Sequence, residues 1–540
     1  MFAHDLLELS PLIVATLVPT LLVLAAPFAA KRAPFRAATF ATALTAGLSA
    51  VAVLLRATIA LLGVAPSTSK LGAALHALVQ LDLVSSAMLL LVSTLAIVVV
   101  RYSRTYLAGE RGLDRYVRSL LMTLASVTML VVSNHLVFLI GGWFAAGVFL
   151  HQLLMFYRTR RQAVIVAHKT FLLSRLADLF FVGSLAFLSA EVGSLRIDVV
   201  NAYAAEASAF TSPLHVATVL LVVGVLLKTA QVPFHGWVTT VMEAPTPVSA
   251  LLHAGVVNIG GFVMIRLSPL MAHASIAQGM LVGFGLATAI IGSLVMTTRL
   301  SIKVVLAWST IAQMGFMLMQ CGLGVWHLAL LHLLAHSFYK AHAFLTAGSV
   351  VSTWRGASLV QPKKPSLGVV AAAVLVLSVA AAPFYALFKL AGGHASPSLT
   401  SLALVLGLSF VPMVGRALAA GWRAFGLTAL FTAGAAAAYF AGHVLFEEIV
   451  PPLEAGAASP FQWTVVVAGL GVLFVVQVVV QTSPSGGLAR FLHPHLLSGL
   501  YIDDWFTRVT FRLWPPRVER TTAPSPSSIR PRAPLESRQW

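Results

Sequence analysis

The sequence predicts an all-α polytopic membrane protein with about 13 to 15 transmembrane helices. Of its 540 residues, 59% are hydrophobic and only 10% are charged, whereas a soluble domain carries about 25% charged residues. The mean hydropathy is +0.91. Roughly fifteen apolar runs are each long enough to span ~30 Å of hydrocarbon.

The expected spans follow one another along the whole chain. We place them at residues 10–30, 37–63, 83–100, 118–133, 135–156, 163–190, 214–232, 247–268, 275–297, 302–320, 325–351, 366–390, 399–415, 424–446 and 461–481. The first run lacks a preceding basic segment, so we expect no cleavable signal peptide. The single Cys321 excludes an internal disulfide and a cysteine-ligated cluster or zinc site.

Basic residues alternate from loop to loop. Most follow odd-numbered spans, namely Lys31, Arg32, Arg36, Arg101, Arg104, Arg111, Arg115, Arg118, Arg158, Arg160, Arg161, Arg299, Lys303, Lys363, Lys364, Arg416 and Arg423. Even-numbered spans are followed by Lys70, Arg196, Arg266 and the acidic residues Glu447, Glu448 and Glu454. By the positive-inside rule, the N-terminus lies outside and the C-terminus in the cytoplasm. This pattern accounts for the net charge of +18 without a nucleic-acid partner.

A break between two spans carries ionisable residues. Lys228 ends an apolar run, Pro233 and the segment 245–247 follow, and His253 lies inside the next apolar helix. Ionisable groups in hydrocarbon normally face a protein interior or a water-filled path. Broken helices are tolerated where a cavity or a neighbouring helix satisfies the freed backbone. The stretch from Lys228 to Phe262 therefore predicts an ion or proton site at mid-membrane.

A second group lies on one helical stripe in the eleventh span. His332, His336 and Lys340 are spaced i, i+4, i+8 and share one face. Because histidine titrates near neutral pH, this row favours a proton relay through bridging water. Interhelical hydrogen bonds are the structural alternative. Metal binding is a third interpretation, but no HExxH pattern or nearby carboxylate supports it.

Other ionisable residues of the spans have open roles. Arg175 and Asp178, at i, i+3, form a local pair, pair with Lys169, or join the relay. Arg56 and His151 are more simply interior groups with local partners. In the turn after the seventh span lies Glu243, either as a proton entry point or as a solvated carboxylate.

The chain ends in two basic segments. Residues 488–515 include LYIDDWFTRVTFRLWP, in which Arg508 and Arg512 lie one turn apart among apolar residues. This pattern favours a short helix at the cytoplasmic interface over one that docks a partner. After Pro516 the sequence is rich in Pro, Ser and Arg, so we expect disorder.

An internal repeat is expected. Lys228 lies in a span that is followed by Pro233, and Lys389 lies five spans later in a span that holds Pro383. An odd offset inverts the second unit, and inverted repeats with broken helices are typical of ion-coupled transporters. The predicted division is N-terminal helices (1–117), a first repeat (118–268), a second repeat (275–415), C-terminal helices (424–481), an interfacial helix (488–515) and a basic tail (516–540).

Four stretches carry a family resemblance. They are YSRTYLAGERGLDRY at 102–116, KTAQVPFHGWVTTVMEAPTPVSALLHAG at 228–255, IKVVLAWSTIAQMGFM at 302–317 and HLLAHSFYKAHAFLTAGSV at 332–350. Together they resemble the antiporter-like membrane subunits of respiratory complex I and of Mrp-type cation/proton antiporters, over about residues 80 to 395. The resemblance implies two inverted five-helix repeats and a polar axis. It places in the proton path Lys228, His253, Lys303, His332, His336, Lys340 and Lys389.

Two departures indicate a divergent branch. The family usually places a glutamate after the tryptophan of the fifth span, but here Phe144 follows Trp143, so Asp178 is the candidate partner of Lys228. The chain also lacks the long lateral helix of the L-type subunit of complex I. It resembles instead the membrane subunits of the two-component DAB inorganic carbon transporters, whose DabA partner is a large zinc protein similar to a β-carbonic anhydrase.

The resemblance implies a multi-pass protein of the bacterial inner membrane that couples a cation gradient, expected to be of protons, to bicarbonate or CO2 uptake by that partner. The alternatives are an L-type proton-pumping subunit of NADH-quinone oxidoreductase and an Mrp-type sodium/proton antiporter subunit. Phosphate-binding, nucleophile-elbow and dinucleotide motifs are missing. We therefore expect no covalent chemistry and no cofactor in this chain, with zinc confined to the partner.

Overall fold

The computed structural model describes residues 2–30, 34–63, 69–207, 209–239, 243–349, 366–390, 397–450 and 458–515. The long helices are α1 (Phe2–Ala25), α2 (Pro34–Leu62), α4 (Leu83–Tyr106), α5 (Leu113–Val132), α6 (Leu136–Leu154), α7 (Arg161–Val192), α9 (Ser212–Lys228), α14 (Ser275–Met296), α15 (Ile302–Gly322), α16 (Trp326–Leu345), α18 (Leu367–Leu390), α19 (Pro397–Ala420), α20 (Trp422–Ile449) and α21 (Pro460–Thr482). The shorter ones are α3 (Lys70–Leu78), α8 (Ile197–Glu206), α10 (Gly236–Thr239), α11 (Thr246–Ala254), α12 (Ile259–Arg266), α13 (Ser268–Ala272), α22 (Gly487–Leu497) and α23 (Ile502–Leu513).

The helices confirm the predicted fold class. In the described ranges, 12 segments are long and apolar enough to cross a membrane, with α11 and α12 together forming one of them. The other three expected spans lie on α9 and α18, which contribute shorter apolar stretches, and on α16, which carries the polar row. All fifteen expected spans thus fall on helices of the structure.

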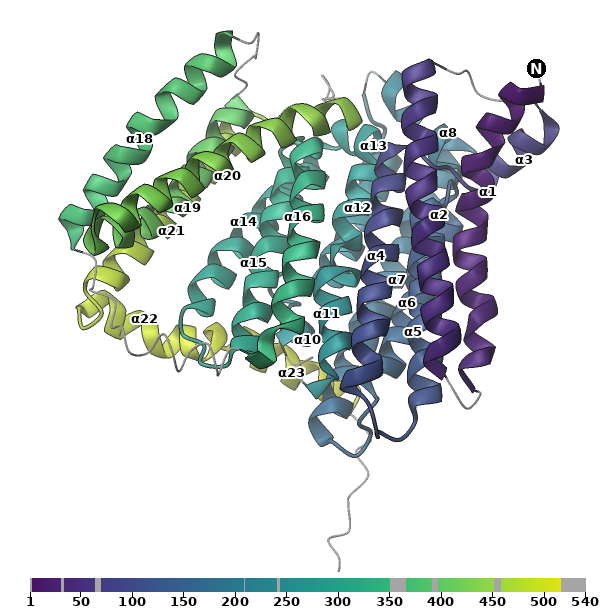
Figure 1. Cartoon of the computed structure of the whole chain (residues 1–540), viewed down its shortest axis with the longest axis horizontal. Helices are drawn as coiled ribbons and strands as arrows, with labels where there is room; N and C mark the ends of the chain where they lie inside the picture. Colours follow the sequence, from purple (N-terminus) through teal and green to yellow (C-terminus); the bar gives the residue numbers. More distant parts are fainter. Residues whose placement is uncertain are drawn as a thin grey trace, which may run out of the picture.

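Figure 1 shows two groups of helices joined along one edge. Helices α1 to α16 form the larger bundle. Helices α18 to α21 lie beside it, where α21 contacts α14 and α20 contacts α16. Helices α22 and α23 run along one edge of the larger bundle (Figure 1). Within this bundle α14 and α15 approach closely, because Gly285 on α14 and Gly315 on α15 leave no side chain between their backbones.

The turns after α4, α6 and α14 lie at the same edge as the C-terminal helices. Tyr157 donates a hydrogen bond to Glu110 at 3.4 Å, which joins the first two turns. His168, near the start of α7, contacts the carbonyl of Trp514 at 2.9 Å. Arg299 donates to the carbonyl of Leu497 at 2.9 Å. These three turns hold many of the basic residues predicted to face the cytoplasm, so those residues gather on one edge.

The C-terminal segment differs from the single interfacial helix expected over 488–515. Leu500 and Tyr501 adopt left-handed backbone angles, with φ of 58° and 61°, and divide it into α22 and α23. Helix α23 docks on this chain's own core, where Phe506 meets Phe234 edge to face at 5.7 Å between ring centroids. The predicted tail, residues 516–540, lies outside the described residues.

Candidate functional site

The predicted break follows α9 directly. Lys228 is the last residue of α9, and Ala230 then adopts a left-handed φ of 54°. The peptide bond before Pro233 is cis. The amide of Val232 donates to the hydroxyl of Thr288 on α14 at 3.1 Å, which satisfies part of the freed backbone. The cation of Lys228 thus lies at a helix C-terminus, where the helix dipole favours positive charge.

Asp178 supplies the negative charge beside Lys228. Its carboxylate, midway along α7, lies 2.7 Å from Lys228 Nζ, and the two side chains are 13% and 5% exposed. Arg175 reaches the other oxygen of the same carboxylate at 3.0 Å. The local i, i+3 pair and the pair across helices therefore both form, and one carboxylate lies between two cations. Such a cluster keeps an excess positive charge among apolar helices.

The residue at the family's usual glutamate position points elsewhere. The ring of Phe144 lies under the guanidinium of Arg175 at 3.8 Å and is 44% exposed. Its neighbour Trp143 is buried, stacks on Phe181 at 5.0 Å, and lies 5.2 Å from Lys228 Nζ. An aromatic face attracts a cation, so Phe144 positions Arg175 while Trp143 contacts Lys228.

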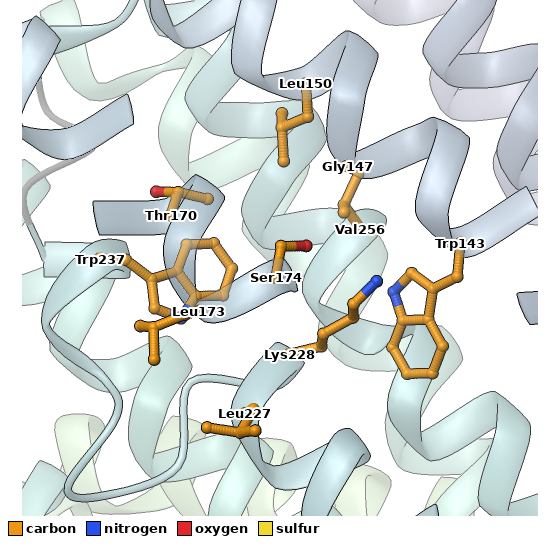
Figure 2. A pocket seen from close by; sticks show the side chains of 10 residues that line it. All are labelled: Trp143, Gly147, Leu150, Thr170, Leu173, Ser174, Leu227, Lys228, Trp237 and Val256. Atoms are coloured by element: carbon orange, nitrogen blue, oxygen red, sulfur yellow. The ribbon is translucent and has the colours of Figure 1, made fainter. Parts of the chain in front are cut away.

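A small cavity reaches the Lys228 ammonium. Its volume is about 30 Å³, which leaves room for about two waters. Figure 2 shows Lys228 directed toward Trp143 across this space, with Thr170 and Ser174 of α7 and Trp237 of α10 also at the wall. An ammonium has three N–H donors, and Asp178 engages one of them at most. The remaining donors can bind water in the cavity.

The row on α16 forms the second cluster. His332 lies 2.9 Å from the side-chain oxygen of Gln320, and its ring centroid is 6.0 Å from that of His336. His336 is 5% exposed, and neither of its ring nitrogens has a protein partner among the described residues. Lys340 donates to the carbonyl of Leu306 at 3.2 Å and contacts the hydroxyl of Ser309. The three side chains share one face as predicted, and Lys340 has neutral oxygens as its partners.

The other predicted lysines and histidines flank this row. His253 is fully buried on α11 and stacks on Phe344 of α16 with centroids 4.4 Å apart. Lys303 donates to Thr246 at 2.8 Å, at the start of the same helix α11. Lys389 belongs to the last turn of α18, and its side chain lies outside the described residues. Helix α11 thus carries His253, which contacts α16, and also contacts Lys303 at its first residue.

Other expectations are resolved by direct contacts. Glu243 lies 3.6 Å from Arg160 in a half-exposed pair, so it is not a free carboxylate. His151 contacts the carbonyl of Ala167 at 3.1 Å. Lys169 does not reach Asp178 and instead meets Asp503 of α23 at 2.6 Å. In the described ranges no three histidine, cysteine or acidic side chains lie close enough to hold a metal ion.

Sequence reasoning missed two polar contacts between distant helices. His327 and His443 meet at 3.0 Å between α16 and α20, and Glu447 lies 3.6 Å from His443. Asp503 is the partner of Lys169. A signal existed for the second, because the acidic pair Asp503 and Asp504 interrupts a basic segment. For the contact between His327 and His443, the only signal was that each histidine lies near the end of a span. That signal does not indicate which residue is the partner.

Comparisons with known proteins agree with this architecture. Residues 133–391 match the membrane-domain model of the NADH:quinone oxidoreductase/Mrp antiporter family. The chain is 37% identical over 469 residues to the probable inorganic carbon transporter subunit DabB2 of Halothiobacillus neapolitanus, covering 82% of each chain. It is 36% identical over 452 residues to the probable inorganic carbon transporter subunit DabB of Hydrogenovibrio crunogenus, covering 80% of this chain and 83% of the relative.

Among solved structures, the Mrp complex from Dietzia sp. DQ12-45-1b superposes with a TM-score of 0.59 at 20% identity. The match covers 94% of this chain and 59% of the Mrp chain. This likeness shows the antiporter-like fold. The identity and coverage of the two carbon-transporter relatives place the chain in a narrower group. The chain belongs to the DabB family of inorganic carbon transporter subunits, and its residues 133–391 match the NADH:quinone oxidoreductase/Mrp antiporter type of membrane domain.

Proposed function

We propose that this chain is the energy-coupling, proton-translocating membrane subunit of a two-component uptake pump for inorganic carbon. Protons would run down their gradient through the Lys228 cluster and the α16 row, and this current would drive bicarbonate or CO2 accumulation by a partner subunit. The single observation that carries the proposal is the buried Lys228 ion pair, placed at a helix break beside a cavity with room for water.

The chemistry of the cluster supports a proton as the coupling ion. Lysine and histidine side chains exchange protons, whereas a sodium ion needs oxygen ligands. Lys340 and His336 offer nitrogen at the second cluster, and the two neutral oxygens beside Lys340 are engaged by its ammonium. The partner we propose is a DabA-like zinc protein similar to a β-carbonic anhydrase. The membrane would be the bacterial inner membrane, with the basic edge in the cytoplasm and the N-terminus outside.

Substitution of Lys228 tests the proposal. In the native host, Lys228→Met keeps a long apolar side chain but removes the charge. We expect the variant to reach the membrane in normal amounts, to grow only with added CO2, and to lose carbon uptake. Lys70→Met, at an exposed lysine outside the spans, is the matched control and should grow like the parent. Growth of Lys228→Met in air at the parental rate would refute the proposal.

Two further measurements separate the alternatives. A protonophore should abolish uptake in the parent strain, whereas a sodium-selective ionophore should leave it intact, and the reverse result would make sodium the coupling ion. Purification of the tagged chain should recover a large zinc-containing subunit. If quinone oxidoreductase subunits are recovered instead, and deletion of this chain leaves growth in air unchanged, the chain would be better interpreted as an L-type subunit of NADH-quinone oxidoreductase.

A further inference from the structure

One carboxylate of α23 lies beside the segment that follows the helix break after Lys228. Asp503 Oδ1 accepts a hydrogen bond from Lys169 Nζ at 2.6 Å, and the two side chains are 30% and 3% exposed. The same oxygen fills the space beside Gly236, the first residue of α10, where an added Cβ would overlap Asp503. The glycine is therefore required for this carboxylate to approach the break.

Both neighbours of Asp503 adjoin the wall of the Lys228 cavity. Lys169 precedes Thr170, and Gly236 precedes Trp237. Thr170 and Trp237 both line the cavity that contains the Lys228 ammonium (Figure 2). Asp503 thus contacts two residues that are each next in the chain to a residue of the cavity wall, and it is itself partly exposed. The Asp503–Lys169 pair thus places polar groups between the partly exposed edge and the two chain segments that line the cavity.

Helix α23 also has contacts with the bundle other than this charged pair. Phe506 packs against Phe234, and the carbonyl of Trp514 contacts His168 at 2.9 Å. An ion pair that is largely withdrawn from water rarely stabilises a protein more than apolar residues of similar volume do. A proton relay, however, needs a buried group whose partner can exchange protons with solvent. Buried Lys169 and partly exposed Asp503 have this arrangement.

We propose that Asp503 and Lys169 form the terminus of the Lys228 pathway at the basic edge. The N–H proton of the Lys169 ammonium moves to Asp503 Oδ1 across the hydrogen bond and leaves a neutral amine. A proton from cavity water, released by Lys228, restores the ammonium. The Asp503 carboxylic acid then loses its proton to the solvent at the edge. This inference rests on the proposed function and assigns one end of its route.

The test compares three variants of the full chain, in its complex, reconstituted into liposomes with an imposed pH gradient. Asp503→Asn keeps an oxygen that accepts from Lys169 but cannot carry a proton, so we expect proton flux to fall on the order of a hundredfold. Asp503→Glu should restore much of the flux. Asp504→Asn, at the exposed neighbouring carboxylate, should behave like the parent. Parental flux in Asp503→Asn would overturn the inference.

A cross-link separates relay from attachment. Cysteines introduced together at His168 and Trp514 report whether α23 is docked and leave the contact between Phe234 and Phe506 in place, since the native Cys321 is buried. The Asp503→Asn variant should form this cross-link as fast as the parent while losing flux. Loss of both would make Asp503 an attachment residue and refute the relay. Lys228→Met serves as the reference: if it also transports protons normally, the proposed function itself fails, whereas its inactivity beside an active Asp503→Asn refutes only the inference.

Discussion

At the residue scale, Asp178 decides how this chain balances the charge of Lys228. The glutamate expected after Trp143 is replaced by Phe144, whose ring binds Arg175 instead. The carboxylate comes from the middle of α7 and is shared between Arg175 and Lys228. Because both cations depend on it, a change in the charge of Lys228 alters how strongly Asp178 holds Arg175. The two basic groups are therefore coupled through a single carboxylate.

Asp198 is a carboxylate outside the spans whose ionisation stabilises the fold. Burial opposes its charge, but hydrogen bonds from Arg196 at 2.6 and 3.1 Å and the charge of that guanidinium outweigh burial and lower the pKa of Asp198. The unfolded chain therefore binds this proton more readily. The resulting stability is complete above the ordinary pKa of about 4 and is lost as the pH falls through the lowered value.

We expect Asp198→Asn to destabilise the protein at pH 7 by about 0.5 kcal/mol, since Arg196 is 38% exposed and solvent screens the pair. Thermal unfolding in detergent should show the difference from the parent shrinking below about pH 4. Asp114→Asn is the control, because Asp114 and Arg118 are more than half exposed and 3.9 Å apart. A difference that is the same at pH 3 and pH 7 would contradict the assignment.

At the element scale, α14 supports the broken helix through its contact with α15. Thr288 of α14 accepts the hydrogen bond from the amide of Val232 after the break. The position of Thr288 depends on the close approach of α14 to α15 at Gly285, whose added Cβ would lie 2.6 Å from the carbonyl oxygen of Gly315. Packing of this pair and geometry of the break are therefore linked.

Gly285→Ala tests this link. The methyl group would meet backbone atoms of α15, and overpacking of this kind costs about 1–3 kcal/mol. We expect a lower unfolding temperature and reduced carbon uptake. Gly283→Ala places the same methyl on the same helix in open space and should unfold like the parent. Equal unfolding temperatures of the two variants would show that α14 and α15 can move apart without loss of stability.

At the scale of the whole molecule, the arrangement of charge bears on orientation. The turn after α4 contacts the turn after α6, the first half of α7 contacts the end of α23, and the turn after α14 contacts α22. These contacts lie on one edge, while α3 and α8 lie at the opposite edge (Figure 1). The basic residues of these turns thus act together as one surface. By the positive-inside rule we propose that this surface faces the cytoplasm.

Cysteine labelling checks the orientation directly. A membrane-impermeant maleimide applied to spheroplasts should label Lys70→Cys at the start of α3 and should leave Ala108→Cys, in the turn after α4, unlabelled until the membrane is opened. Both positions are exposed, and the buried Cys321 contributes little background. Labelling of Ala108→Cys in intact spheroplasts would reverse the proposed orientation.

The sequence alone determined the helical class, the positions of the spans and the common face of His332, His336 and Lys340. These properties depend on hydrophobic length and on the 3.6-residue period, which are local. Only the tertiary structure decided which charges meet, such as Asp178 with Lys228 and Asp503 with Lys169. The second pair joins residues 334 positions apart. Such contacts depend on how every intervening helix packs, and helical periodicity contains no information about that packing.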